Sequence, residues 1–211
     1  IDLLVATHID GDHVNGLVFV ARHFNVKQLW TNGQALNSNA CRELMDIVRE
    51  KRIVLPAFEA IQRDVRIHGT FLNILHPPRD FEPGLADDKD ANDHSIVLKL
   101  QHGQTSFLLP GDITRNAEKR LVDAAGARLQ SQVLLSPHHG SATSSSDHFL
   151  RSVRPEIVIV SAGWRNRFGF PHPSVMDRYQ RYNCQIFQTA VHGAIYLVSD
   201  GKRIAVRPTI N

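Results

Sequence analysis

The chain has 211 residues, 42% of them hydrophobic, with 24 Lys and Arg against 21 Asp and Glu and a formal net charge of +3. This length fits a single domain over residues 1–211 whose core needs no disulfide bridges, and Cys41 and Cys184 are either two free thiols or one bridge. No apolar run approaches the about 20 residues of a membrane helix and no signal peptide opens the chain, so we expect a soluble protein as given.

The charge is unevenly distributed along the chain. Residues 151–211 hold 9 Lys and Arg against 3 Asp and Glu, whereas residues 1–150 hold 15 against 18. A basic region beside a carboxylate-rich one fits a site in which cations hold an anionic substrate and acids hold metal ions. A basic face that only keeps the protein soluble explains the same charges.

Strand-like and helix-like segments alternate without internal repeats, which predicts an α/β layered fold. In chain order we predict a strand at Leu3–Ala6, a helix at about Val14–His23, a strand at Lys27–Trp30, a helix at Cys41–Glu50, strands at Phe71–Leu75, Ser95–Leu100 and Thr105–Leu109, a helix at about Thr114–Ala125, a strand at Gln132–Leu135, a helix near Ser146–Arg151, a strand at Ile157–Val160, a helix at about Ser174–Tyr182, and strands at Gln185–Gln188, Ala194–Val198 and Ile204–Val206. The proline-rich and acidic segment His76–Asp93 is expected to be one long loop.

The densest polar cluster follows the first predicted strand and contains His8, Asp10, Asp12 and His13. If the extended backbone continues past the strand, His8, Asp10 and Asp12 point to one side and can share a metal ion. On a helix, His8 and Asp10 would lie roughly 200° apart. The alternative is a solvated turn in which Asp12 caps the next helix and His13 is a surface residue.

Three later strands are also followed by polar clusters. Asp112 follows one, the run His138-His139-Gly140-Ser141 follows another, and a loop ending in His172 follows the third. Because loops at strand ends carry chemistry on a rigid scaffold, we expect all the clusters to converge at one sheet edge.

Taken in order, these motifs resemble the metallo-β-lactamase superfamily, and within it the nuclease-like domain of ComEC competence proteins. The motifs that carry the resemblance are His8-Ile9-Asp10-Gly11-Asp12-His13, Pro110-Gly111-Asp112, Pro137-His138-His139-Gly140-Ser141 and Phe170-Pro171-His172-Pro173. The resemblance implies a four-layer αββα sandwich, here lacking the usual N-terminal strands. It also implies metal ligation by His8, Asp10, Asp12, His13, Asp112 and His172, with Asp112 as the bridge. Phe170 stands where the family usually has histidine.

Two divalent cations held by three carboxylates would leave a net charge of about +1, which attracts phosphate. Such a pair lowers the pKa of bound water and stabilises charge on the attacking and leaving oxygens. A carboxylate at Asp10, where the superfamily signature has a second imidazole, shifts the preference from zinc towards manganese, so we expect Mn²⁺ at least to compete with Zn²⁺.

The candidate catalytic residues are Asp12, His138 and His139; each histidine is either a further metal ligand or a general acid, and we favour the acid role for at least one. Ser141 is a candidate donor to phosphate, or part of a cap for the next helix. Arg165 and Arg167 alternate with aromatic residues, as in proteins that bind single-stranded nucleic acid, although such aromatics also serve as packing anchors.

We therefore expect a binuclear metal-dependent phosphodiesterase or nuclease that acts on DNA, with single-stranded DNA as its partner. The ComEC resemblance implies a role in DNA uptake at the extracytoplasmic face of the membrane, beside a membrane channel domain of a parent protein. The alternatives are a hydrolase of a small ester or lactam, and a catalytically silent DNA-binding module with a structural metal. Whether Asn92 or His94 contributes to the site stays open.

Overall fold

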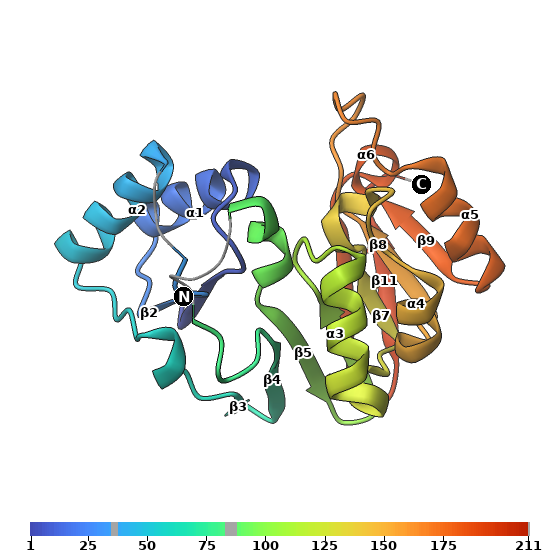
Figure 1. Cartoon of the computed structure of the whole chain (residues 1–211), viewed down its shortest axis with the longest axis horizontal. Helices are drawn as coiled ribbons and strands as arrows, with labels where there is room; N and C mark the ends of the chain where they lie inside the picture. Colours follow the sequence, from blue (N-terminus) through green and yellow to red (C-terminus); the bar gives the residue numbers. More distant parts are fainter. Residues whose placement is uncertain (35–37, 83–87, 211) are drawn as a thin grey trace. The chain divides into compact units, whose positions relative to one another are not determined.

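A computed structural model describes residues 1–34, 38–82 and 88–210. They form two compact units (Figure 1). The first unit contains residues 1–62 and 76–96, and the second contains residues 63–75 and 97–211. Each unit has a hydrophobic core of its own. The single domain over residues 1–211 stays a prediction.

The first unit is built on a strand, helix, strand motif. β1 (Leu3–Ala6) pairs in parallel with β2 (Gln28–Thr31), and α1 (Gly11–His23) connects them. α2 (Asn39–Glu50) packs beside α1, and its first turn is capped by the hydroxyl of Ser38, which accepts from the amide of Cys41 at 3.1 Å. Apolar residues at helical spacing form the core between the two helices: Val14, Val18 and Ala21 on α1 and Cys41, Leu44, Ile47 and Val48 on α2. The short 3-10 helices are η1 (Phe58–Ala60) and η3 (Asp88–His94).

The second unit is built on a sheet that has seven strands among the described residues, in the order β3-β4-β5-β6-β7-β8-β9 (Figure 1). The strands are β3 (Asp64–Ile67), β4 (Thr70–His76), β5 (Val97–His102), β6 (Thr105–Leu109), β7 (Val133–Leu135), β8 (Ile157–Val160) and β9 (Gln185–Gln188). β3 with β4 and β5 with β6 are antiparallel pairs, whereas β6, β7, β8 and β9 run in parallel. The loops after β6, β7 and β8 therefore leave the sheet at the same edge.

Three helices cover this sheet and share its core. They are α3 (Arg115–Ala125), α4 (Asp147–Val153) and α5 (Pro173–Arg181). Their buried side chains meet apolar strand residues such as Leu108, Leu134 and Val158. The remaining elements are η4 (Gly126–Leu129), the tight turn η5 (Pro137–Gly140), α6 (Thr189–His192), and a hairpin of β10 (Ile195–Ser199) and β11 (Ile204–Pro208).

The predicted α/β class is confirmed, with four corrections in detail. α1 begins at Gly11 rather than at Val14, because the carbonyl of Asp10 already accepts helical hydrogen bonds. β3 and α6 were not expected, and η3 lies within the segment expected to be one loop. β1 belongs to a separate two-stranded sheet, so the first polar cluster does not leave the same sheet as the other three. Residues 83–87 of the expected loop lie outside the described residues.

The structure shows the state of the two cysteines and the character of the helices. Cys41 and Cys184 are both free thiols in the described part of the chain, which excludes the bridge between them. In that same part, every helix is too short or too polar to cross a membrane.

Candidate metal centre

His8 is the most deeply buried of the predicted ligands, with no exposed surface. Its Nδ1 lies 3.0 Å from the hydroxyl of Thr7 and 3.3 Å from the hydroxyl of Ser95. Because the Ser95 hydroxyl donates its own proton to the carbonyl of Asn92 at 2.8 Å, it accepts from His8 Nδ1. This arrangement places the ring proton on Nδ1 and leaves Nε2, 3.8 Å from a carboxylate oxygen of Asp10, to donate a lone pair.

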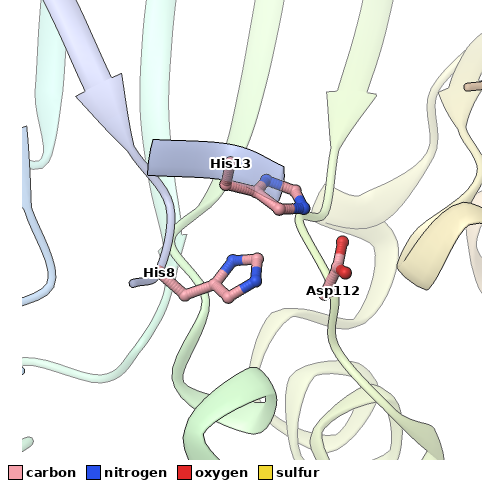
Figure 2. Close-up of side chains that lie close together, drawn as sticks. All are labelled: His8, His13 and Asp112. Carbon is pink, nitrogen blue, oxygen red and sulfur yellow. The ribbon is translucent and has the colours of Figure 1, made fainter. Parts of the chain in front are cut away.

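His13 lies against His8 in the same unit. The two ring centroids are 4.1 Å apart and the ring planes are tilted by 53° (Figure 2). Asp12 and His13 are in the first turn of α1, which corrects the expectation that extended backbone carries His8, Asp10 and Asp12 to one side. Asp10 precedes the helix, and its carboxylate makes no capping hydrogen bond. The first unit thus brings two imidazoles and the Asp10 carboxylate together, with Asp12 exposed in the first turn of α1.

In the second unit, Asp112 and His139 form the contact that bears most directly on metal binding. Asp112 follows β6, is 4% exposed, and carries the carboxylate drawn in Figure 2. Its Oδ2 lies 3.3 Å from His139 Nε2, while His139 Nδ1 lies 2.7 Å from the carbonyl of Ser161. A carbonyl only accepts, so Nδ1 carries the proton and the Nε2 of a neutral ring faces a carboxylate oxygen with a lone pair. Either a second proton on the ring or a divalent metal ion between the two atoms would satisfy this contact.

The turn that carries the two histidines has an unusual backbone. His138 and His139 have φ of 49° and 54°, and Gly140 follows with φ of 83°. Residues other than glycine hold this left-handed conformation only where the surroundings enforce it. Here the amide of His138 donates to the carbonyl of Gly111 at 3.2 Å, and the amide of Ser141 donates to the carbonyl of His138 at 2.8 Å. The turn is thereby fixed to the loop that carries Asp112.

His172 lies at the N-terminus of α5. Its Nδ1 accepts from the amide of Ser174 at 3.2 Å and lies 2.8 Å from the hydroxyl of the same residue. Its own amide donates to the carbonyl of Gly140 at 2.8 Å, so its backbone is joined to the histidine turn. With Nδ1 used as an acceptor, the neutral ring carries its proton on Nε2 and can donate a hydrogen bond there.

The substrate candidates lie at the same edge of the second unit. The Ser141 hydroxyl is buried and lies 3.0 Å from that of Thr143, whereas the cap of α4 is Ser146, which accepts from the amide of Phe149. Arg165 and Arg167 are exposed on the loop after β8. The loops that follow three neighbouring strands therefore bring an acid, three histidines and two arginines to one edge of the second unit's sheet.

Comparison with known families agrees with this arrangement. The family model of the metallo-beta-lactamase superfamily matches residues 1–164, which is most of the chain. The chain belongs to this superfamily.

Two similar proteins place the chain more closely within the superfamily, and one solved structure shares its fold. ComE operon protein 3 of Bacillus subtilis is 27% identical over 197 residues, covering 92% of this chain and 24% of that protein. Competence protein ComA of Neisseria gonorrhoeae is 37% identical over 119 residues, covering 55% of this chain and 17% of that protein. This chain thus spans about a quarter of its relatives' length or less. A mutant of CmlA beta-hydroxylase has the same fold at 13% identity, with a TM-score of 0.51 over 89% of this chain and 43% of its own.

The predicted ComEC-type resemblance and the metallo-β-lactamase fold are thus confirmed, and superfamily membership supports a metal-dependent hydrolase. Sequence reasoning missed two residues that hold the site. The first is Ser95, which orients His8 and contacts the carbonyl of its neighbour Asn92; its other neighbour, His94, lies against Phe81 with ring centroids 4.8 Å apart.

The second missed residue is Glu118, a fully buried acid on α3. One carboxylate oxygen accepts from the amide of Ser146 at 2.8 Å and the other from the amide of Ser145. Arg178 donates to the carbonyls of Ser144 and Ser145, so the acid and the base hold the same segment from two sides. Burial raises the pKa of Glu118, against the effect of these hydrogen bonds. An acid among the apolar positions of a helix was the signal that could have found it.

Proposed function

We propose that this chain is a metal-dependent phosphodiesterase that cleaves DNA. The observation that supports this best is the pair of Asp112 and His139, in which a carboxylate oxygen and an imidazole nitrogen, both common metal ligands, lie 3.3 Å apart in the second unit. The candidate donors are His8, Asp12 and His13 in the first unit, and Asp112 and His139 in the second. Asp10 completes the donors. We propose Mn²⁺ or Zn²⁺ as the ions, because imidazole suits zinc and carboxylate suits manganese.

A pair of divalent ions supplies a nucleophile from water and stabilises charge on the attacking and leaving oxygens. The chain's own residues set the rest of the chemistry. Asp10, Asp12 and Asp112 offset three of the four positive charges, so the site keeps an excess positive charge of about one that attracts a phosphodiester. Ser95, through His8 Nδ1, orients the imidazole that donates from Nε2.

His138 is our candidate for the general acid that protonates the leaving oxygen. It lies on the same rigid turn as His139, whose Nδ1 already donates to Ser161. His172 stays a proposed metal ligand, a role in which Nδ1 would donate to the Ser174 hydroxyl and leave the Nε2 lone pair to the ion; with Nδ1 accepting from the Ser174 amide, Nε2 would instead donate a hydrogen bond to a phosphate oxygen. Ser141 stays a candidate donor to phosphate.

The biological setting belongs to the same proposal. The relatives carry the names of competence proteins, and the chain matches only 24% and 17% of their lengths. We propose that the domain acts on DNA during uptake, at the extracytoplasmic face, beside a membrane channel domain of a parent protein. Arg165 and Arg167 would then contact the phosphates of a single strand.

The experiment that tests the proposed function joins metal content with activity. Purified protein is analysed for bound metals by mass spectrometry and assayed with Mn²⁺ or Zn²⁺ on a labelled single-stranded oligonucleotide. We expect Asp12→Ala to lose cleavage and bound metal. Asp46→Ala, which removes an exposed carboxylate of α2 that pairs with Arg49, is the matched control and keeps both.

Two results would refute the proposal in different ways. Turnover of a chromogenic β-lactam without cleavage of DNA would indicate a hydrolase of small substrates. DNA binding that survives Asp112→Ala, with no cleavage under either metal, would indicate a silent binding module.

A further inference from the structure

The conformation of the loop between β8 and α5 is held by the hydrogen bonds of one polar side chain, Asn166, and two of its large aromatic side chains are exposed. The Asn166 side chain donates to the carbonyls of Gly163 and Phe170 at 3.0 and 2.6 Å and accepts from the amide of Phe170 at 2.9 Å. Trp164 and Phe168 remain 70% and 62% exposed. They are therefore not packing anchors, and the closed loop presents both rings to solvent.

The exposed ring of Phe168 begins a row of rings that ends at the candidate acid. Phe168 and Phe170 are stacked, with centroids 5.5 Å apart and planes 19° from parallel. Phe170 then meets His138 edge to face, with centroids 5.9 Å apart. A flat apolar group placed on Phe168 would thus continue a stack that leads to the histidine turn.

The guanidinium group of an arginine lies over each of the two exposed rings. The Cζ of Arg167 lies 4.7 Å from the centroid of Phe168, and the Cζ of Arg165 lies 5.7 Å from the centroid of Trp164. Aromatic rings for bases and cations for phosphates are the combination by which proteins bind single strands. The surrounding residues 151–211 add to the positive charge.

We propose that Phe168 and Phe170 form a stacking platform for one nucleobase of a single-stranded nucleic acid, next to His138. This inference rests on the proposed function and deepens it, because it names the feature of the substrate that the site selects. A base in a duplex is already stacked on its neighbours and is not available to the platform. The platform therefore selects single strands by their bases, while the arginines hold their phosphates.

The test measures binding apart from cleavage. Wild-type protein in EDTA is titrated with a fluorescent oligothymidylate and with an abasic strand of equal length and charge, about 12 nucleotides each. Stacking on an aromatic side chain contributes about 1–3 kcal/mol per base, so we expect the oligothymidylate to bind about 5- to 150-fold more tightly. Tryptophan emission gives a second readout, because Trp164 is exposed whereas Trp30 is 4% exposed.

Variants then assign the preference to the platform. Phe168→Leu keeps the apolar volume and should remove most of the preference for bases, whereas Phe168→Tyr should keep it. Tyr196→Leu removes a ring of similar exposure, 59%, on β10 outside the loop, and should leave both affinities unchanged.

The outcomes separate this inference from the proposed function. Equal binding of the two strands by wild-type protein, or an unchanged preference in Phe168→Leu, overturns the platform even if DNA is cleaved. Base-dependent binding that needs Phe168, without cleavage under Mn²⁺ or Zn²⁺, supports the platform and overturns the nuclease.

Discussion

The buried carboxylate of Glu118 provides a sharp test of how the segment between the histidine turn and α4 is held. Its two oxygens accept from the backbone amides of Ser145 and Ser146, directly before α4. Glu118→Gln keeps the shape of the side chain but replaces one of these acceptors by an NH₂ group. One buried amide then faces a donor instead of an acceptor.

The size of the effect follows from that single lost acceptor. Leaving one buried donor unsatisfied costs about 1–3 kcal/mol, so we expect Glu118→Gln to lower the free energy of unfolding by this amount at neutral pH. Glu118→Ala loses both acceptors and should cost about twice as much. Glu156→Gln changes an exposed glutamate of the same unit and is the control, with an expected change within about 0.5 kcal/mol.

The pH dependence has a definite sign. Burial raises the pKa of Glu118 above its ordinary value of 4.5, so the folded state favours the protonated form. The contribution that the protonated Glu118 makes to the free energy of unfolding is fully present below the ordinary pKa. It is lost as the pH rises through the raised pKa. The stability difference between wild type and Glu118→Gln should therefore narrow as the pH rises from 4.5 through that range.

Urea unfolding at several pH values measures these differences, and hydrogen exchange of the segment around Ser145 shows where the loss occurs. A cost no larger than that of Glu156→Gln would contradict the reasoning. A difference that widens with rising pH would show that the hydrogen bonds, rather than burial, dominate the titration of Glu118.

Three further predictions follow from other contacts. Ser95→Ala removes the hydroxyl that orients the buried imidazole and should weaken metal binding about 10- to 100-fold in a chelator competition, whereas the equally buried control Ser131→Ala should not. Gly140→Ala should cost more than about 1 kcal/mol in urea unfolding, because φ is 83° and the added Cβ would lie 2.7 Å from the Cβ of Pro171; unchanged stability would refute this account. His172→Asn keeps a capping side chain, so cleavage should fall while the melting temperature changes little, and a large fall in melting temperature would assign His172 a structural role instead.

The sequence predicted the strands and helices that have clear periodicity, including the three parallel strands whose loops carry Asp112, His139 and His172. It did not predict β3, because Asp64–Ile67 is mostly exposed and its four residues are too few for the alternation Asp-Val-Arg-Ile to stand out. The turn His68-Gly69, with both residues at positive φ, was the available signal for that hairpin.

The residues that support the site were harder to predict than its ligands. Motifs reveal ligands because their spacing is local. The contact of Ser95 with His8 joins residues 87 positions apart, and that of Glu118 with Ser145 joins residues 27 apart. Such pairs are defined only once the chain has folded, so a periodicity that marks Glu118 as buried still does not show which residue it contacts.

The chain passes between its two units after Gln62, Leu75 and Ile96, so the β3 and β4 hairpin is encoded between two segments of the first unit. A fragment that begins at Val97 would therefore lack β3 and β4, and with them the strand that borders β5 on one side. The backbone amides and carbonyls of β5 would then lie at an open edge of the sheet. Such an edge can pair with a second molecule and cause precipitation. Shortened versions of this protein should consequently keep residues 63–75, even when only the histidine turn and the arginine loop are of interest.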